Sequence, residues 1–369
     1  MELWREWRRE AGLSRGRHGY ACAITPRRAG RPILTLGVSL AMSLGLLAPF
    51  VTAGMAEASA RFFSPGSVWN RKLSVHARLD PRSAAIVAAF NREVTTEIPR
   101  RMLNINTTAW SVPLYTVPPT QPTVTVGLAK PNRSLKPLVY LQDAWSAVPL
   151  PSGAQPARGT DRILAVWQPS TDRMWEFYGF QNGPTGPTAV WGGAMERVSS
   201  NRGFYDPSAW PNAQRTWGAS ASSLPIVGGL MTFEDLARGR IDHALAIAIP
   251  NVRAGVYAAP AQRTDGTSAN PLSLPEGAHL RLDPRLELSR LHMPPLTRRM
   301  AEAAQRYGII VSNKASNVTF SGQDPTPTGT DPYAGPGGYF EGKCPCKLLA
   351  SFPWRHLQLL KMDLRRTPQ

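Results

Sequence analysis

Short segments in which apolar and polar residues alternate follow one another between residues 113 and 250. Pro, Gly and Asn separate the clearest of them, which span residues 124–126, 163–167, 174–180, 189–191 and 241–249. A period of two residues is typical of strands that are buried on one face. The pattern therefore predicts antiparallel strands, and residues 169–173, which contain Pro, Ser, Thr and Asp, favour a hairpin between two of them.

Three segments instead show the signals of helices. Asp80 and Pro81 precede an apolar run at residues 84–90, so Asp80 is the expected N-cap and Pro81 the first helical residue. Residues 232–239 begin like a capping box and end in Gly, which predicts a short helix. A longer helix is expected over residues 296–307, where apolar residues form one stripe.

Many short strands and few helices indicate the fold class. The sequence predicts a mostly β chain, arranged as a two-sheet antiparallel sandwich of the jelly-roll kind with a few short helices. Residues 323–342 hold many Gly, Pro, Thr and Asp without a periodic pattern, so a long loop is expected there. No internal repeat and no change in composition marks a second domain. We therefore expect a single β-sandwich domain over residues 61–369.

The N-terminal 60 residues have the features of an export signal. Residues 32–55 carry no charge, follow a basic flank with three arginines, and lead to Ala58-Ser59-Ala60, a pattern that signal peptidase accepts. We expect residues 1–60 to be removed, with cleavage after Ala60. The alternative is an uncleaved anchor, because an uncharged run of this length can span a bilayer. The sequence thus predicts a secreted protein without membrane contact after cleavage.

Composition and charge narrow the possible partners. Of 369 residues, 42% are hydrophobic and 18% are charged, which is typical of a globular chain and excludes wholesale disorder. The 42 Lys and Arg residues exceed the 25 Asp and Glu residues, for a net charge of +17. Because the basic residues are scattered, we expect no nucleic-acid partner. An extracellular polysaccharide, acidic in character, is the expected partner, and a basic surface that only aids solubility is the alternative.

The spacing of the cysteines and the absence of known catalytic motifs argue against several kinds of site and classes of enzyme. Cys344 and Cys346 stand one residue apart, so they form either a local disulfide or two free thiols, and they are too few for a zinc site. The sequence contains no Gly-x-Ser-x-Gly, no phosphate-binding loop, no dinucleotide fingerprint and no His-Glu-x-x-His. The absence of these motifs argues against a serine esterase, a nucleotide-binding enzyme and a zinc protease. We expect no cofactor and no metal.

His243 is the first candidate for chemistry. Strand alternation places it on one face with Ile241 and Leu245. A histidine at the floor of a cleft beside apolar residues could act as a general acid or base, whereas the alternative is a core histidine bonded to the backbone. Asp242 is expected on the opposite face, and it is a weaker candidate for a catalytic carboxylate than Glu176. Arg240 lies beside this segment and is expected to bind an acidic substrate.

Glu176 is the second candidate. It lies in the middle of a predicted strand, between aromatic residues and on the same face as Tyr178. A carboxylate in such surroundings could be an acid of raised pKa in a glycosidase pair, or it could orient a catalytic histidine. The alternative is a glutamate on the solvent face, paired with Arg162 or Arg173 across the hairpin.

Aromatic residues are candidate sugar-binding platforms, because an aromatic face packs against the apolar side of a pyranose. Trp191 and Trp217 lie in or beside Gly-rich segments, so they and Tyr178 are the predicted substrate-binding aromatic residues. Glu234 and Asp235 are instead assigned to a helix start, where acidic residues stabilise the helix regardless of function.

Several sequence blocks resemble a group of secreted bacterial proteins of unassigned function. The longest are Trp217-Gly-Ala-Ser-Ala-Ser-Ser-Leu-Pro and Gly239-Arg-Ile-Asp-His-Ala-Leu. Shorter blocks begin at Phe63, Trp167 and Tyr307, so the resemblance covers most of the chain after the predicted signal. The resemblance implies an exported, self-contained module that acts on polysaccharide, and it transfers no catalytic residue.

These observations together predict a secreted enzyme that cleaves polysaccharide. Its predicted catalytic residues are His243, Glu176 and Asp242, and its predicted substrate-binding residues are Arg240, Tyr178, Trp191 and Trp217. A glycoside hydrolase needs two carboxyl groups, whereas a lyase on an acidic glycan needs a base and a positive group, and both remain open. The alternative from another class is a non-catalytic glycan-binding or cell-envelope protein.

Overall fold

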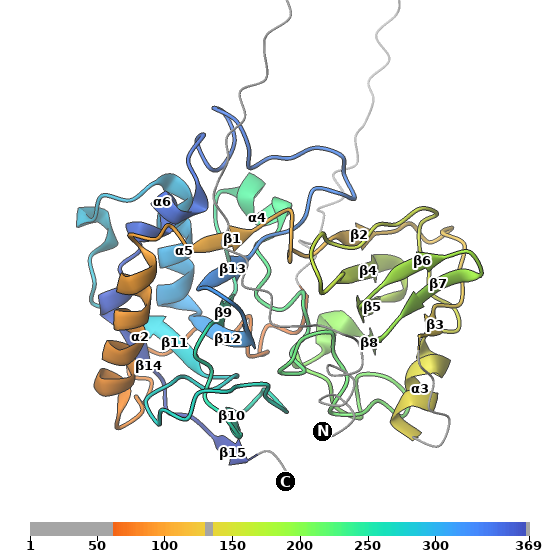
Figure 1. Cartoon of the computed structure of the whole chain (residues 1–369), viewed down its shortest axis with the longest axis horizontal. Helices are drawn as coiled ribbons and strands as arrows, with labels where there is room; N and C mark the ends of the chain where they lie inside the picture. The colour runs from red at the N-terminus through yellow and green to blue at the C-terminus, as the bar shows by residue number, and fades with distance from the viewer. Residues whose placement is uncertain (1–61, 130–135, 367–369) are drawn as a thin grey trace, which may run out of the picture.

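The computed structural model describes residues 62–129 and 136–366, which form two groups of sheets side by side (Figure 1). The predicted export signal, residues 1–60, lies outside these described residues. The chain is mostly sheet with a few short helices, in agreement with the sequence pattern. Within the described ranges, no helix is long and apolar enough to cross a membrane.

The larger sheet has six strands in the order β1-β13-β9-β12-β11-β14. The strands are β1 (Asn104–Asn106), β13 (Thr319–Ser321), β9 (Leu245–Ile249), β12 (Ile309–Lys314), β11 (His279–Leu282) and β14 (Leu357–Leu359). β1 runs parallel to β13 and β9 runs parallel to β12, whereas the other neighbours are antiparallel. Helices α2 (Ser83–Glu97), α5 (Pro295–Arg306) and α6 (Pro345–Ala350) lie in the same half of the molecule (Figure 1).

The other half contains a four-stranded sheet and a three-stranded sheet. The first has the order β2-β4-β5-β8 and the second the order β3-β7-β6. Their strands are β2 (Leu114–Thr116), β4 (Leu164–Gln168), β5 (Arg173–Tyr178), β8 (Trp191–Glu196), β3 (Gly127–Leu128), β7 (Gly186–Ala189) and β6 (Gln181–Gly183). Helix α3 (Lys136–Ala144) lies beside these sheets (Figure 1).

The remaining elements are short. Strands β10 (Val256–Ala258) and β15 (Leu364–Arg366) form a separate antiparallel pair. Helix α4 (Phe233–Arg238) precedes β9 in the chain. Single 3-10 turns cover Pro169–Thr171, Val198–Ser200, Leu288–Arg290 and Trp354–His356.

The predicted hairpin is confirmed, but the predicted antiparallel sandwich is not. β4 and β5 pair in antiparallel register, with Val166 opposite Trp175. The described strands form four sheets, however, and four strand pairs are parallel. Alternation along a strand indicates which faces are buried, but it carries no information on the partner or direction of a strand that pairs across a long connection.

The three predicted helices are present, with one corrected start. α2 begins at Ser83, and its N-cap is Arg82, so the prediction of Asp80 as N-cap with Pro81 first in the helix is wrong. Asp80 instead accepts a hydrogen bond from the Arg82 N–H, at 2.8 Å, in the turn before the helix. The predicted loop, residues 323–342, contains no helix or strand: Gln323 forms an isolated bridge with Val112, and the remaining residues include turns and bends.

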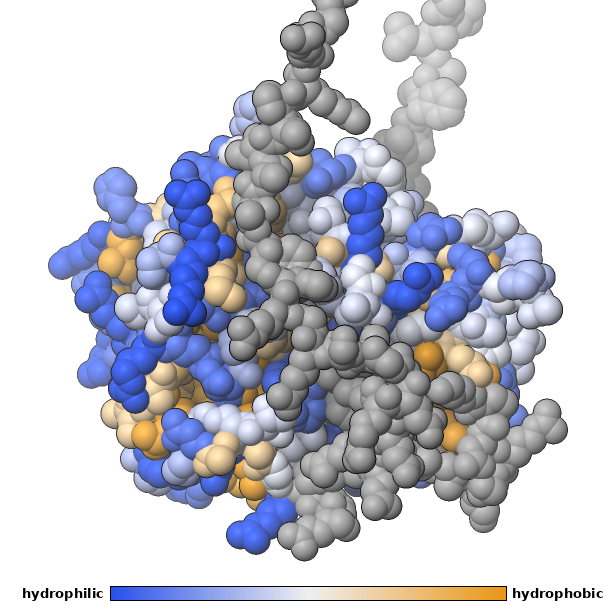
Figure 2. All heavy atoms as spheres, viewed as in Figure 1, coloured by the Kyte–Doolittle hydropathy of each residue, from blue (hydrophilic) through white to orange (hydrophobic). Residues whose placement is uncertain are grey.

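Each half of the molecule has its own hydrophobic core. The core around the four-stranded sheet contains Trp145, Phe177 and Phe180, with ring centroids 4.9 and 5.8 Å apart. The core around the six-stranded sheet contains Phe352 and Trp354, whose ring centroids lie 4.7 Å apart. On the part of the face in Figure 2 that the grey atoms leave uncovered, hydrophilic residues alternate with smaller patches of apolar residues.

One loop, residues 217–231, connects the two cores, and we call it the seam loop. Its Ser222 hydroxyl donates to the Ser312 carbonyl of β12, at 2.5 Å, and its Gly229 carbonyl accepts from the Ala246 N–H of β9, at 3.0 Å. On the other side, its Gly218 N–H donates to the carbonyl of Gly192 in β8, at 2.8 Å. Backbone and side-chain hydrogen bonds therefore attach this loop to both main sheets.

Trp69 packs against the seam loop and is 1% exposed. Its indole N–H donates to the Gly203 carbonyl, at 2.8 Å, and its ring lies so close to Gly228 and Gly229 that a Cβ at either position would overlap it. Its carbonyl accepts a hydrogen bond from the Ala244 N–H just before β9. Glycine is required here because the indole occupies the space of the side chain.

The substitution Gly277→Ala tests the packing of the segment before β11. Both Gly277 and Gly255 have a positive φ, but a Cβ at Gly277 would overlap the Ala258 carbonyl, whereas a Cβ at Gly255 meets nothing. We expect Gly255→Ala to lower the free energy of unfolding by about 1 kcal/mol and Gly277→Ala to lower it by more than about 4 kcal/mol. Urea denaturation measures both, and equal losses would contradict the described packing.

Candidate functional site

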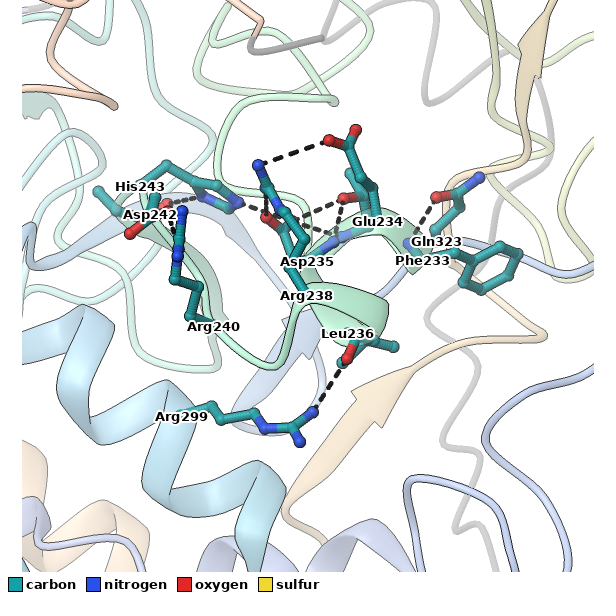
Figure 3. Close-up of polar contacts among 12 residues, drawn as sticks. Phe233, Glu234, Asp235, Leu236, Arg238, Arg240, Asp242, His243, Arg299 and Gln323 are labelled. Carbon is teal, nitrogen blue, oxygen red and sulfur yellow. Dashed lines mark hydrogen bonds and ion pairs between the residues drawn. The ribbon is translucent and has the colours of Figure 1, made fainter. Parts of the chain in front are cut away.

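His243 lies in a network of charged side chains beside α4 (Figure 3). Its Nε2 is 3.1 Å from Asp235 Oδ2, and its Nδ1 is 2.9 Å from the Ala244 carbonyl oxygen. The strand begins only at Leu245, so the predicted alternation from residue 241 does not apply to His243. The histidine side chain is 17% exposed. It is therefore positioned by the turn between α4 and β9 rather than by a strand.

Both ring nitrogens of His243 face oxygen atoms that can only accept hydrogen bonds at neutral pH. The ring satisfies both when it is doubly protonated. Burial alone would lower the pKa of His243, but the hydrogen bond and the charge of Asp235 raise it above its ordinary value. A ring that donates through both nitrogens has no lone pair for general-base catalysis.

Asp235 owes its position to the start of α4. The N-cap Thr232 and Asp235 form a capping box, in which the Thr232 hydroxyl accepts from the Asp235 N–H at 3.1 Å and the Asp235 carboxylate accepts from the Thr232 N–H at 3.0 Å. Burial would raise the pKa of Asp235, but His243 and Thr232 lower it to about 2. The sequence pattern predicted that Asp235 lies at the start of a helix. It gave no indication that the Asp235 carboxylate also pairs with His243.

The other charged groups of this network are paired with one another (Figure 3). Arg240 Nε donates to Asp242 Oδ2, at 2.6 Å, and Arg238 contacts the carboxylates of Glu234 and Asp235, at 3.4 and 2.8 Å. A pocket of about 30 Å³ lies against these residues, with room for about one or two water molecules. The pocket is too small for a sugar unit.

Glu176 lies in the core around the four-stranded sheet and is completely buried. Its Oε1 accepts from the Ala219 N–H, at 2.6 Å, and its Oε2 accepts from the Ile226 N–H, at 2.9 Å. Burial raises the pKa of Glu176 to about 7, against the lowering effect of these two N–H groups and of the Tyr205 hydroxyl. The carboxyl group thus holds the seam loop, and it faces no solvent.

The proposed pairing of Glu176 with an arginine on the hairpin does not occur. Arg162 Nε donates to the Phe180 carbonyl, at 2.7 Å, and Arg173 forms an ion pair with Glu196, at 3.6 Å. Nor does the structure join Glu176 to His243, because no hydrogen bond or ion pair links them in residues 62–129 and 136–366. They are held by different segments of the chain.

A buried arginine lies on the other side of the seam loop. Arg263 donates to the carbonyls of Gly218 and Ser220, at 3.1 and 2.8 Å, and its guanidinium lies 5.6 Å from the ring centre of Trp191. Burial lowers the pKa of Arg263 to about 10. Nearby, burial and the charge of Asp265 raise the pKa of Glu276 well above its ordinary value.

The predicted aromatic platforms have different surroundings. Trp217 is completely buried and Tyr178 is 9% exposed, so neither ring presents a face to a polymer. Trp191 is partly exposed, and its indole N–H donates to the Thr216 carbonyl, at 3.2 Å. Of these three residues, only Trp191 keeps an accessible edge, and one side of its ring is occupied by Arg263.

A second, larger cavity than the one beside α4 is a groove of about 560 Å³ beside α2. It is lined by α2, by the segment after β9 and by the loop before β11. Its polar lining residues are Arg92, Glu93, Thr96, Glu97, Arg100, Asn251, Ser268, Asn270, Ser273 and Ser316. A volume of this size accommodates a small ligand or part of a polymer. The groove combines hydroxyl, amide, carboxyl and guanidinium groups over an apolar floor that includes Phe90 and Leu272.

Two carboxyl groups, Glu93 and Glu97, lie one helical turn apart in this groove. Glu93 Oε1 accepts from the Asn251 N–H, at 3.3 Å, and Glu97 Oε2 accepts from the Val318 N–H, at 2.8 Å. Burial raises the pKa of Glu93. Burial also raises the pKa of Glu97 to about 7, the charge of Glu93 adds to the rise, and the Val318 N–H and Arg100 oppose it.

These two glutamates were not among the residues predicted from the sequence, although a signal was present. Ile86, Phe90 and Val94 form the apolar stripe of α2, and all three are buried. Glu93 and Glu97 are spaced three and seven residues from Phe90, so they fall on the same side of the helix. A carboxyl group on the buried side of an amphipathic helix is expected to have a perturbed pKa.

Comparisons of the chain with protein-family models, with curated proteins and with solved structures gave no match. Within the described ranges, no group of three or more His, Cys, Asp or Glu residues could hold a metal ion. The resemblance to secreted bacterial proteins therefore stays a prediction, and the assignment of a site rests on geometry and electrostatics.

The substitution His243→Gln tests the ion pair with Asp235. Because the pKa of His243 is raised in the folded state, its contribution to stability is present below about pH 6.5 and is lost as the pH rises through the folded pKa. We expect the variant to lose about 2 kcal/mol of unfolding free energy at about pH 6 and much less at about pH 9. Urea denaturation at both pH values measures this, with the exposed His292→Gln as control. A loss independent of pH would exclude the charged pair.

The substitution Glu176→Gln tests the buried carboxyl group. Between about pH 4.5 and pH 7 the folded protein keeps a proton that the unfolded chain releases, so stability falls with rising pH in that window and is level above it. In the Glu176→Gln variant, the difference between the unfolding free energies at about pH 5 and pH 7 should be smaller than in the wild type by about 2 kcal/mol. Glu302→Gln on α5 is the control, and an unchanged pH dependence of the Glu176 variant would contradict the assignment.

Proposed function

We propose that the protein is an exported glycoside hydrolase that cleaves a polysaccharide in the groove beside α2. One observation carries the proposal: the groove of about 560 Å³ is lined by two carboxyl groups of raised pKa, together with hydroxyl and amide groups. Sugars are bound by such groups, and glycosidases use two carboxyl groups about 5–10 Å apart. Residues at i and i+4 of a helix have Cβ atoms about 5–6 Å apart, so both carboxyl groups can act on the same bond of a bound substrate.

The two carboxyl groups have different surroundings, and these assign their roles. Glu97 is 6% exposed and, with a pKa of about 7, keeps its proton near neutral pH, so it is the general acid that protonates the leaving oxygen. Burial raises the pKa of Glu93 too, but Glu93 is less buried than Glu97, and the hydrogen bond that it accepts from the Asn251 N–H opposes the rise. Glu93 is therefore the nucleophile or the base that activates water.

The groove favours hydrolysis over elimination. No His or Tyr is among its lining residues, all of which belong to the described ranges, so a lyase would lack its usual base there. The exposed residues Arg92 and Arg100 line the groove beside the two glutamates. Together with the excess of basic over acidic residues, which remains when residues 1–60 are removed, they support an acidic polysaccharide as the substrate.

Incubation with a panel of neutral and acidic polysaccharides tests the proposal. We expect new reducing ends without the absorbance of an unsaturated sugar. Glu97→Gln and Glu93→Gln should each lower kcat by about 10²–10⁴-fold, while kcat/KM of the wild type should fall as the pH rises above about 7 because Glu97 loses its proton. The amide oxygen that Glu97→Gln introduces can still accept from the Val318 N–H, so the fold should be retained.

Glu302→Gln, on α5 and outside the groove, is the matched control and should keep full activity. Binding of a polysaccharide without any product would instead support the non-catalytic alternative. Loss of turnover in a folded His243→Gln variant, combined with full activity of Glu97→Gln, would move the active site to the charged network beside α4 and contradict the proposal.

A further inference from the structure

We propose that Cys344 and Cys346 form a thiol–disulfide exchange site that reacts with a small anionic thiol. The two residues, which are separated by two positions in the sequence, are joined by a disulfide. The sequence alone had left open whether they form a local disulfide or two free thiols. Neither cysteine lines the groove beside α2, so this inference does not depend on the proposed hydrolase.

The disulfide contributes little to holding the fold. It encloses only Pro345 between the two cysteines, and a cross-link stabilises a fold less when the loop that it closes is shorter. α6 is anchored by other contacts. The Leu348 carbonyl accepts from the Thr297 hydroxyl, at 3.0 Å, and the Leu349 carbonyl accepts from the Trp354 indole N–H, at 2.8 Å. The helix therefore keeps its position when the disulfide opens.

The two sulfur-bearing residues differ in access. Cys344 is partly exposed, whereas Cys346 is 8% exposed and belongs to the buried side of α6. An attacking thiol reaches Cys344 first, which leaves Cys346 as the leaving group. This asymmetry is the arrangement that an exchange site requires, because attack on one defined sulfur gives one defined mixed disulfide.

The charge around the disulfide selects the thiol. Lys343 and Lys347 flank the two cysteines and are both exposed, and Lys343 Nζ forms an ion pair with Glu341, at 2.6 Å. Because Glu341 balances the charge of Lys343, the positive charge next to Cys346 comes from Lys347. Positive charge beside a cysteine stabilises its thiolate, and it attracts an anionic partner. A small thiol that carries carboxylate groups, such as glutathione, therefore fits this site.

The reaction consumes two thiols. The thiolate of the first attacks Cys344 Sγ, a new S–S bond forms between them, and the bond between Cys344 and Cys346 breaks. Cys346 leaves as a thiolate and takes up a proton. A second thiolate then attacks the sulfur of the first small thiol, which releases the small-molecule disulfide and leaves Cys344 as a thiol. The protein disulfide gains two electrons, and two small thiols are oxidised to one disulfide.

The full chain with Cys22→Ser, which removes the third cysteine, is the protein for the test. With reduced glutathione in millimolar excess, mass spectrometry should show the protein gain two thiols. In the same background, Cys346→Ser leaves only Cys344, and Cys344→Ser leaves only Cys346. With oxidised glutathione, the first variant should form its mixed disulfide at least about 10-fold faster than the second, because only Cys344 is accessible.

A variant with serine at both cysteine positions tests whether the disulfide serves thiol–disulfide exchange or stabilises the fold. Cys344→Ser with Cys346→Ser should change the melting temperature by less than about 2 °C, since the cross-link closes a very short loop. A larger fall would show that the disulfide is a structural staple and would overturn the proposal. A bond that glutathione leaves intact, or equal rates for the two single-cysteine variants, would overturn it as well. Activity of the groove on polysaccharide plays no part in these readouts.

Discussion

The hydrogen bonds from the Ala219 and Ile226 N–H groups to Glu176 are the interactions on which the arrangement of the two halves depends. Glu176 belongs to β5 in one core, and the loop that it holds is bonded to β9 and β12 of the other. A carboxyl group that accepts two main-chain N–H groups in a buried place is costly to remove, because both donors would lose their partners. The seam loop also leads directly into α4, so it positions Asp235 and with it His243.

The same physical effect gives Glu176 and Glu97 their raised pKa values, but the two differ in access. Burial raises both to about 7. Glu176 has both oxygens engaged by the backbone and no solvent, which suits a structural role. Glu97 has one oxygen bonded to the Val318 N–H and lies in a groove of about 560 Å³, which suits an acid that meets a substrate. A carboxyl group of raised pKa is a candidate for catalysis where a cavity adjoins it.

Local features of the fold could be predicted from the sequence, and long-range features could not. The β4–β5 hairpin and α4 follow from turn residues, a capping box and a terminal Gly within a few positions of one another. Glu176 was recognised as unusual, yet its partners lie 43 and 50 residues further along the chain, where no periodicity points to them. His243 was placed on a strand face, but the strand begins two residues later, after a turn fixed by Trp69 and Asp235. The groove glutamates were predictable in principle, because they fall on the apolar side of α2.

The pKa of Glu97 in the folded protein is the most direct test of this account. A pH titration of the side-chain carboxyl ¹³C resonance, assigned by comparison with Glu97→Gln, measures it without any substrate. We expect a midpoint near pH 7, because burial and the charge of Glu93 raise the pKa of Glu97 while the Val318 N–H and Arg100 lower it. A midpoint near the ordinary value of about 4.5 would show that Glu97 is charged at neutral pH, and it would contradict a general acid in the groove.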